Sequence, residues 1–219
     1  MDKDRVLRFS RAERWSHWVN AAAFFVLLFT GLAVFSDKFS FLATLFGGMQ
    51  SARNIHRIAG VIFAFASLAI LIFGDWKAFR VWMKELTTWG KDDFQFLAGF
   101  GKEFFGGHPK LPEQGRFNAG EKINSLLTLG GGTLLTITGF GMWFADSLPL
   151  WFVRWCYPLH DLAALLMTAA IIGHMYLSFL HPGSKEAMNG MLSGTVTRKF
   201  AQEHHGKWYR EVLQKEQKN

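Results

Sequence analysis

The chain has 219 residues, of which 50% are hydrophobic and 16% aromatic, and it carries a formal net charge of +7. Its mean hydropathy of +0.11 is unlike that of a soluble domain of this length and predicts an integral membrane protein. The single cysteine, Cys156, excludes an internal disulfide and an iron–sulfur cluster ligated by this chain. The sequence has no nucleotide-binding loop, catalytic triad or zinc pattern, so its chemistry depends on a bound cofactor.

Four charge-free stretches are long enough, with their flanks, to cross the hydrocarbon core of a bilayer. They cover residues 18–35, 58–73, 123–145 and 162–180. A spanning helix needs about 20 residues, so we expect spans at approximately residues 15–36, 54–75, 121–146 and 157–181. This pattern predicts one all-α domain over residues 1–219, built as a bundle of four transmembrane helices.

Residues 76–105, between the second and third spans, have an amphipathic pattern. Aromatic and aliphatic residues recur there at helical spacing, with Lys77, Arg80 and Lys84 between them. The pattern predicts an interfacial helix on the cytoplasmic side. A run of phenylalanines continues it as either an interfacial belt or a wall beside a lipophilic substrate: Phe94, Phe96, Phe100, Phe104 and Phe105. Residues 182–219 form a polar tail.

The connections between the spans differ in basic charge. Lys and Arg number five before the first span, seven between the second and third, and seven after the fourth, against three on the other side (Lys38, Arg53 and Arg154). The positive-inside rule therefore predicts a multi-pass protein of the bacterial inner membrane with both termini in the cytoplasm. Topology explains the net charge, so no nucleic acid partner is expected.

Four histidines lie in or at the ends of these spans: His17, His56, His160 and His174. Imidazole is costly in a membrane unless something binds it. The fourteen residues from His160 to His174 turn a helix by about 1400°, about 40° short of four full turns, and advance it by about 21 Å. Both rings therefore leave nearly the same face of one helix at two depths.

The predicted orientation sorts these histidines into pairs. His56 and His160 lie toward the outer side, and His17 and His174 lie toward the cytoplasm. Two imidazoles on facing helices can hold one haem as a six-coordinate electron-transfer centre. The sequence thus predicts two b-type haems, one for each pair, whereas the simpler alternative is that each histidine is buried and hydrogen-bonded to a neighbour.

Glycines near the expected haems have two interpretations. Gly31 lies fourteen residues after His17, so it is expected to face the outer haem, where a side chain would collide with the macrocycle. Gly60 and the run Gly130, Gly131 and Gly132 could also make room for a flat ligand. The alternative for each is close packing of helices through small residues.

The chain resembles the cytochrome b (gamma) subunit of respiratory formate dehydrogenases over essentially its whole length. That subunit belongs to a superfamily shared with the cytochrome b of nickel–iron hydrogenases. The resemblance is carried by four features: the segment from Arg14 to Trp18, the His56-Arg57 pair, the stretch from Gly115 to Lys122, and the step from His160 to His174. The family usually has Gln where this chain has Glu121.

The resemblance implies a membrane anchor and electron conduit. It implies that electrons come from an iron–sulfur beta subunit outside the membrane, while a catalytic alpha subunit oxidises formate. They would pass from the outer haem b (His56, His160) to the inner haem b (His17, His174), and then reduce a quinone, menaquinone or ubiquinone, near the cytoplasmic face. The family's quinone-binding residues match Asn118, Gly120 and His174. From the sequence alone, Asn118 would be interpreted as a helix N-cap, and that interpretation remains as the alternative.

Three other functions remain open at this point. One is the cytochrome b of a nickel–iron hydrogenase, which would receive electrons from hydrogen. Another is a stand-alone di-haem cytochrome that oxidises quinol without a dehydrogenase partner. The third is a transporter or channel whose histidines line a path for ions or protons. A transporter or channel of this kind would bind no haem.

Overall fold

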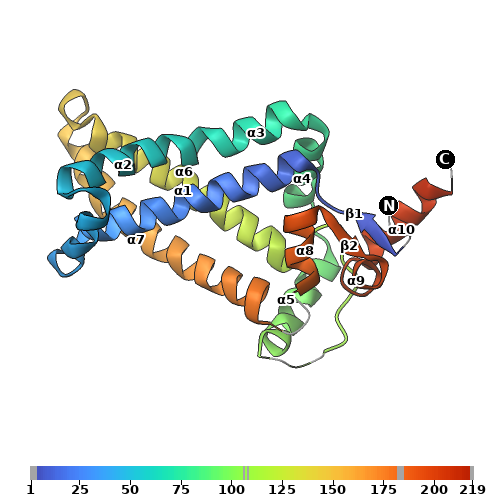
Figure 1. The fold of residues 1–219 in the computed structure, drawn as a ribbon. Helices are drawn as coiled ribbons and strands as arrows, with labels where there is room; N and C mark the ends of the chain where they lie inside the picture. The colour runs from blue at the N-terminus through green and yellow to red at the C-terminus, as the bar shows by residue number, and fades with distance from the viewer. Residues whose placement is uncertain (1–3, 106, 108, 182–184, 218–219) are drawn as a thin grey trace. The chain divides into compact units, whose positions relative to one another are not determined.

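A computed structural model describes residues 4–105, 107, 109–181 and 185–217 (Figure 1). Four of its helices are long and apolar enough to cross a membrane. They are α1 (Arg11–Phe35), the continuous helix of α2 (Met49–Val61), η2 (Ile62–Ala66) and α3 (Ser67–Gly74), α6 (Ala119–Trp143), and α7 (Leu150–Met175) continued by η4 (Tyr176–Leu180). The predicted all-helical, four-span membrane fold is confirmed.

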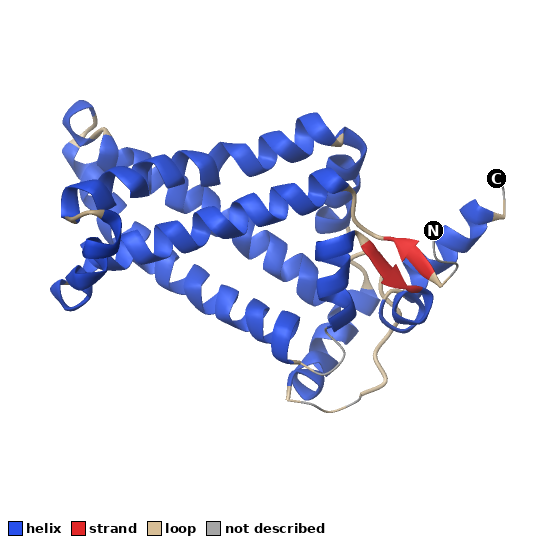
Figure 2. Ribbon diagram, viewed as in Figure 1, coloured by secondary structure: helices blue, strands red, loops and turns tan. Residues whose placement is uncertain are grey.

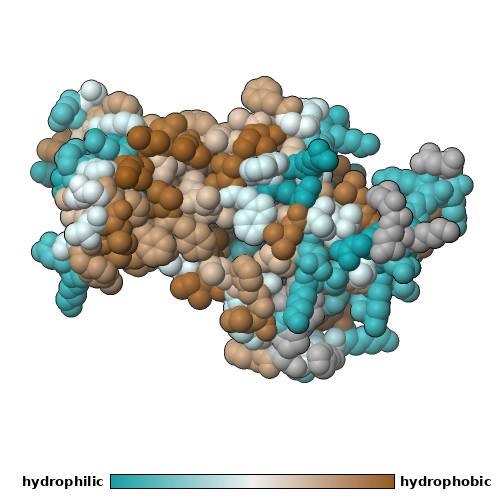
Figure 3. Space-filling model, viewed as in Figure 1, coloured by the Kyte–Doolittle hydropathy of each residue, from teal (hydrophilic) through white to brown (hydrophobic). Residues whose placement is uncertain are grey.

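Large hydrophobic side chains cover the outside of these helices (Figure 3). Phe65, Leu166 and Ile172 are 57%, 64% and 64% exposed. A soluble protein would bury most such side chains, whereas lipid tails solvate them as well as a protein interior does. The fourth span begins at Leu150, before the expected start at residue 157, and Pro158 lies inside it.

The chain divides into two compact units, which are described separately. The bundle unit comprises residues 15–74 and 127–170, and the terminal unit comprises residues 1–14, 75–126 and 171–219. In the bundle unit, alanines at a helix junction pack α1, η1 (Asp37–Phe46) and α2 closely: Ala33, Ala43 and Ala52. The chain leaves η1 through Gly47 and Gly48, whose φ angles of 81° and 103° favour glycine.

In the terminal unit, residues 76–105 form two helices rather than one. The Asp75 carboxylate accepts a hydrogen bond from the Ala78 N–H at 2.9 Å and caps α4 (Trp76–Thr87). The Asp93 carboxylate accepts from the Gly90 N–H at 2.9 Å, which closes a turn at the start of α5 (Lys91–Phe104). Gly90 is a weak helix former, and this side-chain bond stabilises the break.

The polar tail is folded, which the sequence did not predict. It contains α8 (Lys185–Ser193), β2 (Thr195–Thr197), α9 (Arg198–His204) and α10 (Gly206–Glu216). Strand β1 (Arg5–Leu7) pairs with β2 in an antiparallel ribbon with Val6 opposite Val196 (Figure 2). Both valines lie in a small core with Phe200, Ala201 and Trp208. A short 3₁₀ turn, η3 (Ala145–Ser147), completes the elements and precedes α7.

Candidate functional site

His56 on α2 and His160 on α7 face each other in the bundle unit. Their ring centroids are 6.3 Å apart, with an angle of 61° between the ring planes. The two residues are more than a hundred positions apart in the chain, so only the helix packing brings them together. The structure therefore supplies a facing pair of imidazoles among the residues that the sequence singled out.

A threonine holds each of these rings by its Nδ1 atom. Thr30 Oγ1 lies 2.9 Å from His56 Nδ1, and Thr138 Oγ1 lies 2.9 Å from His160 Nδ1. Each threonine hydroxyl donates its own hydrogen to a carbonyl one turn earlier, Val26 O at 2.6 Å and Leu134 O at 2.7 Å. When the threonine hydrogens are donated in this way, the hydroxyl oxygens accept from Nδ1–H, and the Nε2 lone pair of each histidine is available to bind a metal.

A glycine follows each threonine and gives the ring its space. A Cβ at Gly31 would lie 3.3 Å from His56 Cε1, and a Cβ at Gly139 would lie 3.4 Å from His160 Cε1. The same Thr-Gly step on α1 and on α6 thus positions one imidazole each. Gly131 and Gly132 instead lie against Met167 and Phe63, so their role here is close helix packing.

His17 and His174 belong to different compact units, and each is described within its own. His17 lies on α1, where its ring meets the edge of Trp18 with centroids 4.9 Å apart. His174 lies at the end of α7, directly before the π-helical turn η4. Within the terminal unit, His174 is close enough to Glu121 for the carboxylate to interact with it electrostatically.

Asn118 and Glu121 form a reciprocal cap at the start of α6. The Glu121 N–H donates to Asn118 Oδ1 at 2.9 Å, and the Asn118 N–H donates to Glu121 Oε2 at 2.9 Å. The side-chain oxygen of Asn118 therefore caps α6, as the N-cap interpretation predicted. The side-chain nitrogen can donate a further hydrogen bond. Gly120 sits beside this cap, where a Cβ would meet Asn118 Oδ1 at 3.2 Å and Phe100 at 3.8 Å.

Buried charged side chains stabilise the segment that leads into α6, residues 115–118, in the terminal unit. The Arg8 side chain is 1% exposed and donates to both carboxylate oxygens of Glu121 at 2.9 Å and to the Arg116 carbonyl at 2.9 Å. Arg116 pairs with Glu13 at 2.8 Å. Glu121 accepts these bonds as a carboxylate, which accounts for an acid at this position.

His205 supports this segment from the other side. It is 1% exposed, and its Nδ1–H donates to the Gly115 carbonyl at 2.9 Å. Burial, helped by the nearby positive charge of Arg8, lowers the pKa of His205 to about 3. The buried Lys122 pairs with Asp93 at 2.9 Å and adds a tie to α5.

Residues 8–194 match the family described as prokaryotic cytochrome b561. The chain belongs to this family. Among curated relatives, it is 32% identical to the formate dehydrogenase cytochrome b556 subunit of Haemophilus influenzae over 215 residues, which cover 95% of this chain and 84% of the relative. It is 28% identical to the nitrate-inducible formate dehydrogenase cytochrome b556(Fdn) subunit of Escherichia coli K12, with 97% of this chain and 94% of the relative covered. It is 29% identical to the cytochrome b556(fdo) subunit of the same strain, with coverage of 96% and 94%.

Cytochromes of the b561 family bind haem b, and the His56–His160 pair fits that group. Two imidazoles that held one metal ion between them through Nε2, with bonds of about 2 Å, would have ring centroids roughly 6 Å apart. The observed separation is 6.3 Å. Within the described ranges, no three His, Cys, Asp or Glu side chains gather around a bare metal ion, whereas a haem iron needs only two axial ligands from the protein.

Sequence reasoning missed Thr30, Thr138 and Gly139 as site residues in this b561 cytochrome. The available signal was the Thr-Gly dipeptide, which occurs inside two of the expected spans, in each case where one helix must approach a histidine on another. Arg8, Glu13, Arg116 and His205 were missed because they are ordinary polar residues in the sequence, and only the tertiary fold joins them. The remaining histidines (His108, His181, His204 and His205) are expected from the sequence to lie at the surface. That prediction is wrong for His205, which is buried by the fold of the tail, and His108 lies outside the described residues.

Proposed function

We propose that this protein is the di-haem cytochrome b subunit of a membrane-bound formate dehydrogenase, which passes electrons from an iron–sulfur subunit to a quinone. Its partners are then an iron–sulfur beta subunit and a catalytic alpha subunit, and the formate-oxidising site is on the alpha subunit. The relatives named above support this assignment, because they are all formate dehydrogenase subunits and align over nearly the full chain.

The observation that carries the proposal is the His56–His160 pair, with Nε2 of both rings free and centroids 6.3 Å apart. A bound haem supplies one-electron chemistry through its iron. The protein's part is to hold two neutral imidazoles in fixed tautomers, keep them in an apolar bundle and exclude other ligands. We assign a second haem b to His17 and His174 from the spacing in the sequence.

The quinone site is assigned to Asn118, Gly120 and His174. Reduction of a quinone to a quinol takes two electrons and two protons, and its carbonyl oxygens need hydrogen-bond donors. The Asn118 amide nitrogen can donate to such an oxygen while the amide oxygen caps α6. The excess of Lys and Arg supports a position of this site and of both termini on the cytoplasmic side of the bacterial inner membrane, where protons are available.

The donor is tested by adding formate or hydrogen separately to membranes that contain the intact complex, and recording the haem absorption spectrum. We expect formate to reduce the haems within seconds to minutes and hydrogen to leave them oxidised. Reduction by hydrogen alone would assign the chain to a hydrogenase instead. Purified protein with haem but no co-purifying iron–sulfur subunit would support the stand-alone cytochrome, and protein without haem would overturn a cytochrome function.

The outer ligand pair is tested by replacing His160 with Ala. We expect the complex to lose one of two haems and formate to stop reducing the other, because the entry site has been removed. The control is His204→Ala, since His204 is exposed on the tail. Retention of both haems in His160→Ala would refute the assigned pair.

A further inference from the structure

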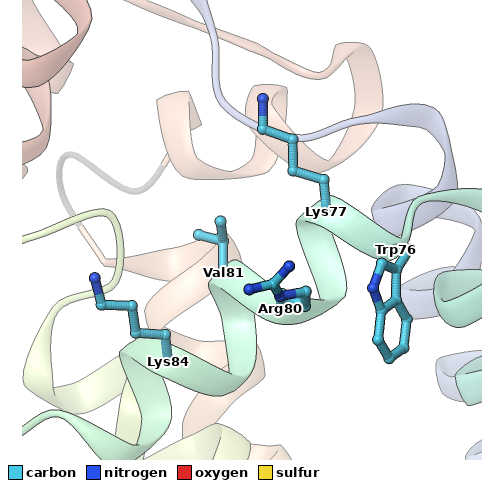
Figure 4. A pocket seen from close by; sticks show the side chains of 5 residues that line it. All are labelled: Trp76, Lys77, Arg80, Val81 and Lys84. Atoms are coloured by element: carbon cyan, nitrogen blue, oxygen red, sulfur yellow. The ribbon is translucent and has the colours of Figure 1, made fainter.

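The α4 helix presents a basic groove that the electron-transfer site does not use. Lys77, Arg80 and Lys84 follow one another at about one per turn, and they line the groove together with Trp76 and Val81 (Figure 4). Its volume is about 320 Å³. That is at the lower end of the range for sites that take small ligands.

No salt bridge among the described residues neutralises these three cations. All three are exposed, and none forms an ion pair in the part of the chain that the structure describes. Two carboxylates adjoin these cations along the chain. Asp75 accepts a hydrogen bond from the Ala78 N–H at 2.9 Å and interacts electrostatically with Lys77, and Glu85 follows Lys84 without pairing with it. The groove therefore carries three positive charges beside an apolar floor, so a complementary ligand has an anionic part and an apolar part.

The groove also lies at a membrane boundary. The second spanning helix ends at Gly74, and α4 begins at Trp76. Phe73 is 88% exposed and Trp76 is 55% exposed, as expected for side chains that meet lipid and headgroups. An acidic protein surface would match the cations alone, whereas a phospholipid also matches the indole and Val81.

We propose that the α4 groove binds the phosphodiester headgroup of an anionic phospholipid, with Lys77, Arg80 and Lys84 as its cationic ligands and Trp76 against the glycerol and upper acyl region. A phosphate accepts hydrogen bonds from several cations at once. The inference is independent of the haem and quinone assignments.

The test measures lipid retention by the intact complex in mixed micelles of phosphatidylglycerol and phosphatidylcholine, by native mass spectrometry. The variant carries Lys77→Gln, Arg80→Gln and Lys84→Gln. The matched control carries Lys91→Gln, Lys110→Gln and Lys215→Gln, which removes the same charge from three exposed positions without ion pairs among the described residues. We expect roughly fivefold weaker retention of phosphatidylglycerol for each α4 cation removed, and unchanged retention in the control.

Several results would overturn the proposal. They are equal retention in the α4 variant and the wild type, equal loss in the control, no preference for phosphatidylglycerol over phosphatidylcholine, and full displacement of the lipid by equimolar inorganic phosphate. Loss of a partner subunit with unchanged lipid retention would assign the helix to a protein interface. If the triple variant does not assemble with haem, Arg80→Gln alone is measured, with an expected loss of roughly fivefold.

Discussion

At the scale of single residues, the threonine hydroxyls hold Nδ1 of His56 and His160 and leave Nε2 of each ring for the proposed haem. Without Thr30, the Nδ1–H of His56 would lose the acceptor 2.9 Å away and keep only the backbone of Leu27 as a partner, so the ring would be held less firmly. A group that hydrogen-bonds to a metal-binding histidine contributes about 10- to 100-fold to metal affinity or activity. The same argument applies to Thr138 and His160.

Replacing Thr30 or Thr138 with Val should therefore lower haem occupancy by about 10-fold or more and change the midpoint potential of the remaining haem. The pyridine haemochrome assay and a redox titration measure these two effects. Thr133→Val is the control, because Thr133 is exposed and its hydroxyl bonds only to Leu129 O at 2.7 Å. Wild-type haem content and potential in both Thr30→Val and Thr138→Val would contradict the assigned role.

A second prediction at this scale concerns the glycine beside His56. Gly31→Ala adds a Cβ 3.3 Å from His56 Cε1, so the ring must shift and haem content should fall. Gly130→Ala is the control, since no heavy atom lies within 4 Å of its Cβ. Replacing glycine with alanine favours the helix by about 1 kcal/mol in both variants. The two variants therefore differ only in the contact of the new Cβ with His56. Equal haem content in the two variants would show that the ring tolerates the added methyl group.

At the scale of elements, the start of α6 combines a helix cap with the proposed quinone donor. Asn118→Ala should cost about 1 kcal/mol in stability and also slow quinone reduction. Asn118→Ser keeps an oxygen that caps the helix but removes the amide nitrogen. We expect Asn118→Ser to unfold like the wild type while its KM for quinone rises. Quinone kinetics unchanged in Asn118→Ser would leave the residue as a cap only.

The folded tail should be sensitive to acid through His205. Its pKa in the folded protein, about 3, is below the ordinary value of about 6.5. Between these two pH values only the unfolded tail binds the proton, so stability is full above about pH 6.5 and falls by about 1.4 kcal/mol per pH unit below it. Hydrogen exchange of residues 195–217 between pH 7 and pH 5 measures this loss. His205→Gln should reduce the slope and the exposed His204→Gln should keep it; identical slopes in both would exclude His205 as the cause.

Sequence patterns predicted the long helices well and the terminal elements poorly. Hydrophobic length identifies a span without any knowledge of its neighbours, because lipid is the solvent on every side. The β1–β2 ribbon depends on Val6 and Val196, which are distant in the chain and meet only after folding. The division between α4 and α5 falls at Gly90, where the Gly90 N–H donates to the Asp93 carboxylate and the Asp93 N–H donates to the Gly90 carbonyl.

At the scale of the whole molecule, basic charge on the loops predicts the topology. Alkaline phosphatase is active only where its disulfides form, outside the cytoplasm. A fusion after Gln217 should be inactive, and an insertion at the turn of Gly47 and Gly48 should be active. Activity at the C-terminus and none at the turn would reverse the orientation, and with it the side proposed for quinone reduction.

The candidate site shows the same division between what local patterns reveal and what packing adds. Histidines in an apolar stretch stand out because membranes exclude unpaired polar groups, and His56 and His160 were paired from depth alone. The threonines that orient them are common in spans and bond to their own helix as well, so nothing local distinguishes them. The Arg8–Glu121 contact likewise joins residues 113 positions apart.

The Thr-Gly step that recurs on α1 and α6 gives the histidine pair an approximate twofold symmetry. Each imidazole has the same kind of acceptor at the same 2.9 Å, and each meets a glycine at nearly the same distance. The hydrogen bonds and glycines around the two rings therefore give the pair no direction, although the Asp161 carboxylate acts on His160 and not on His56. In the proposed function, the direction of electron transfer is then set by the donor and the acceptor at the two ends of the protein, and it reverses when quinol rather than formate is the available reductant.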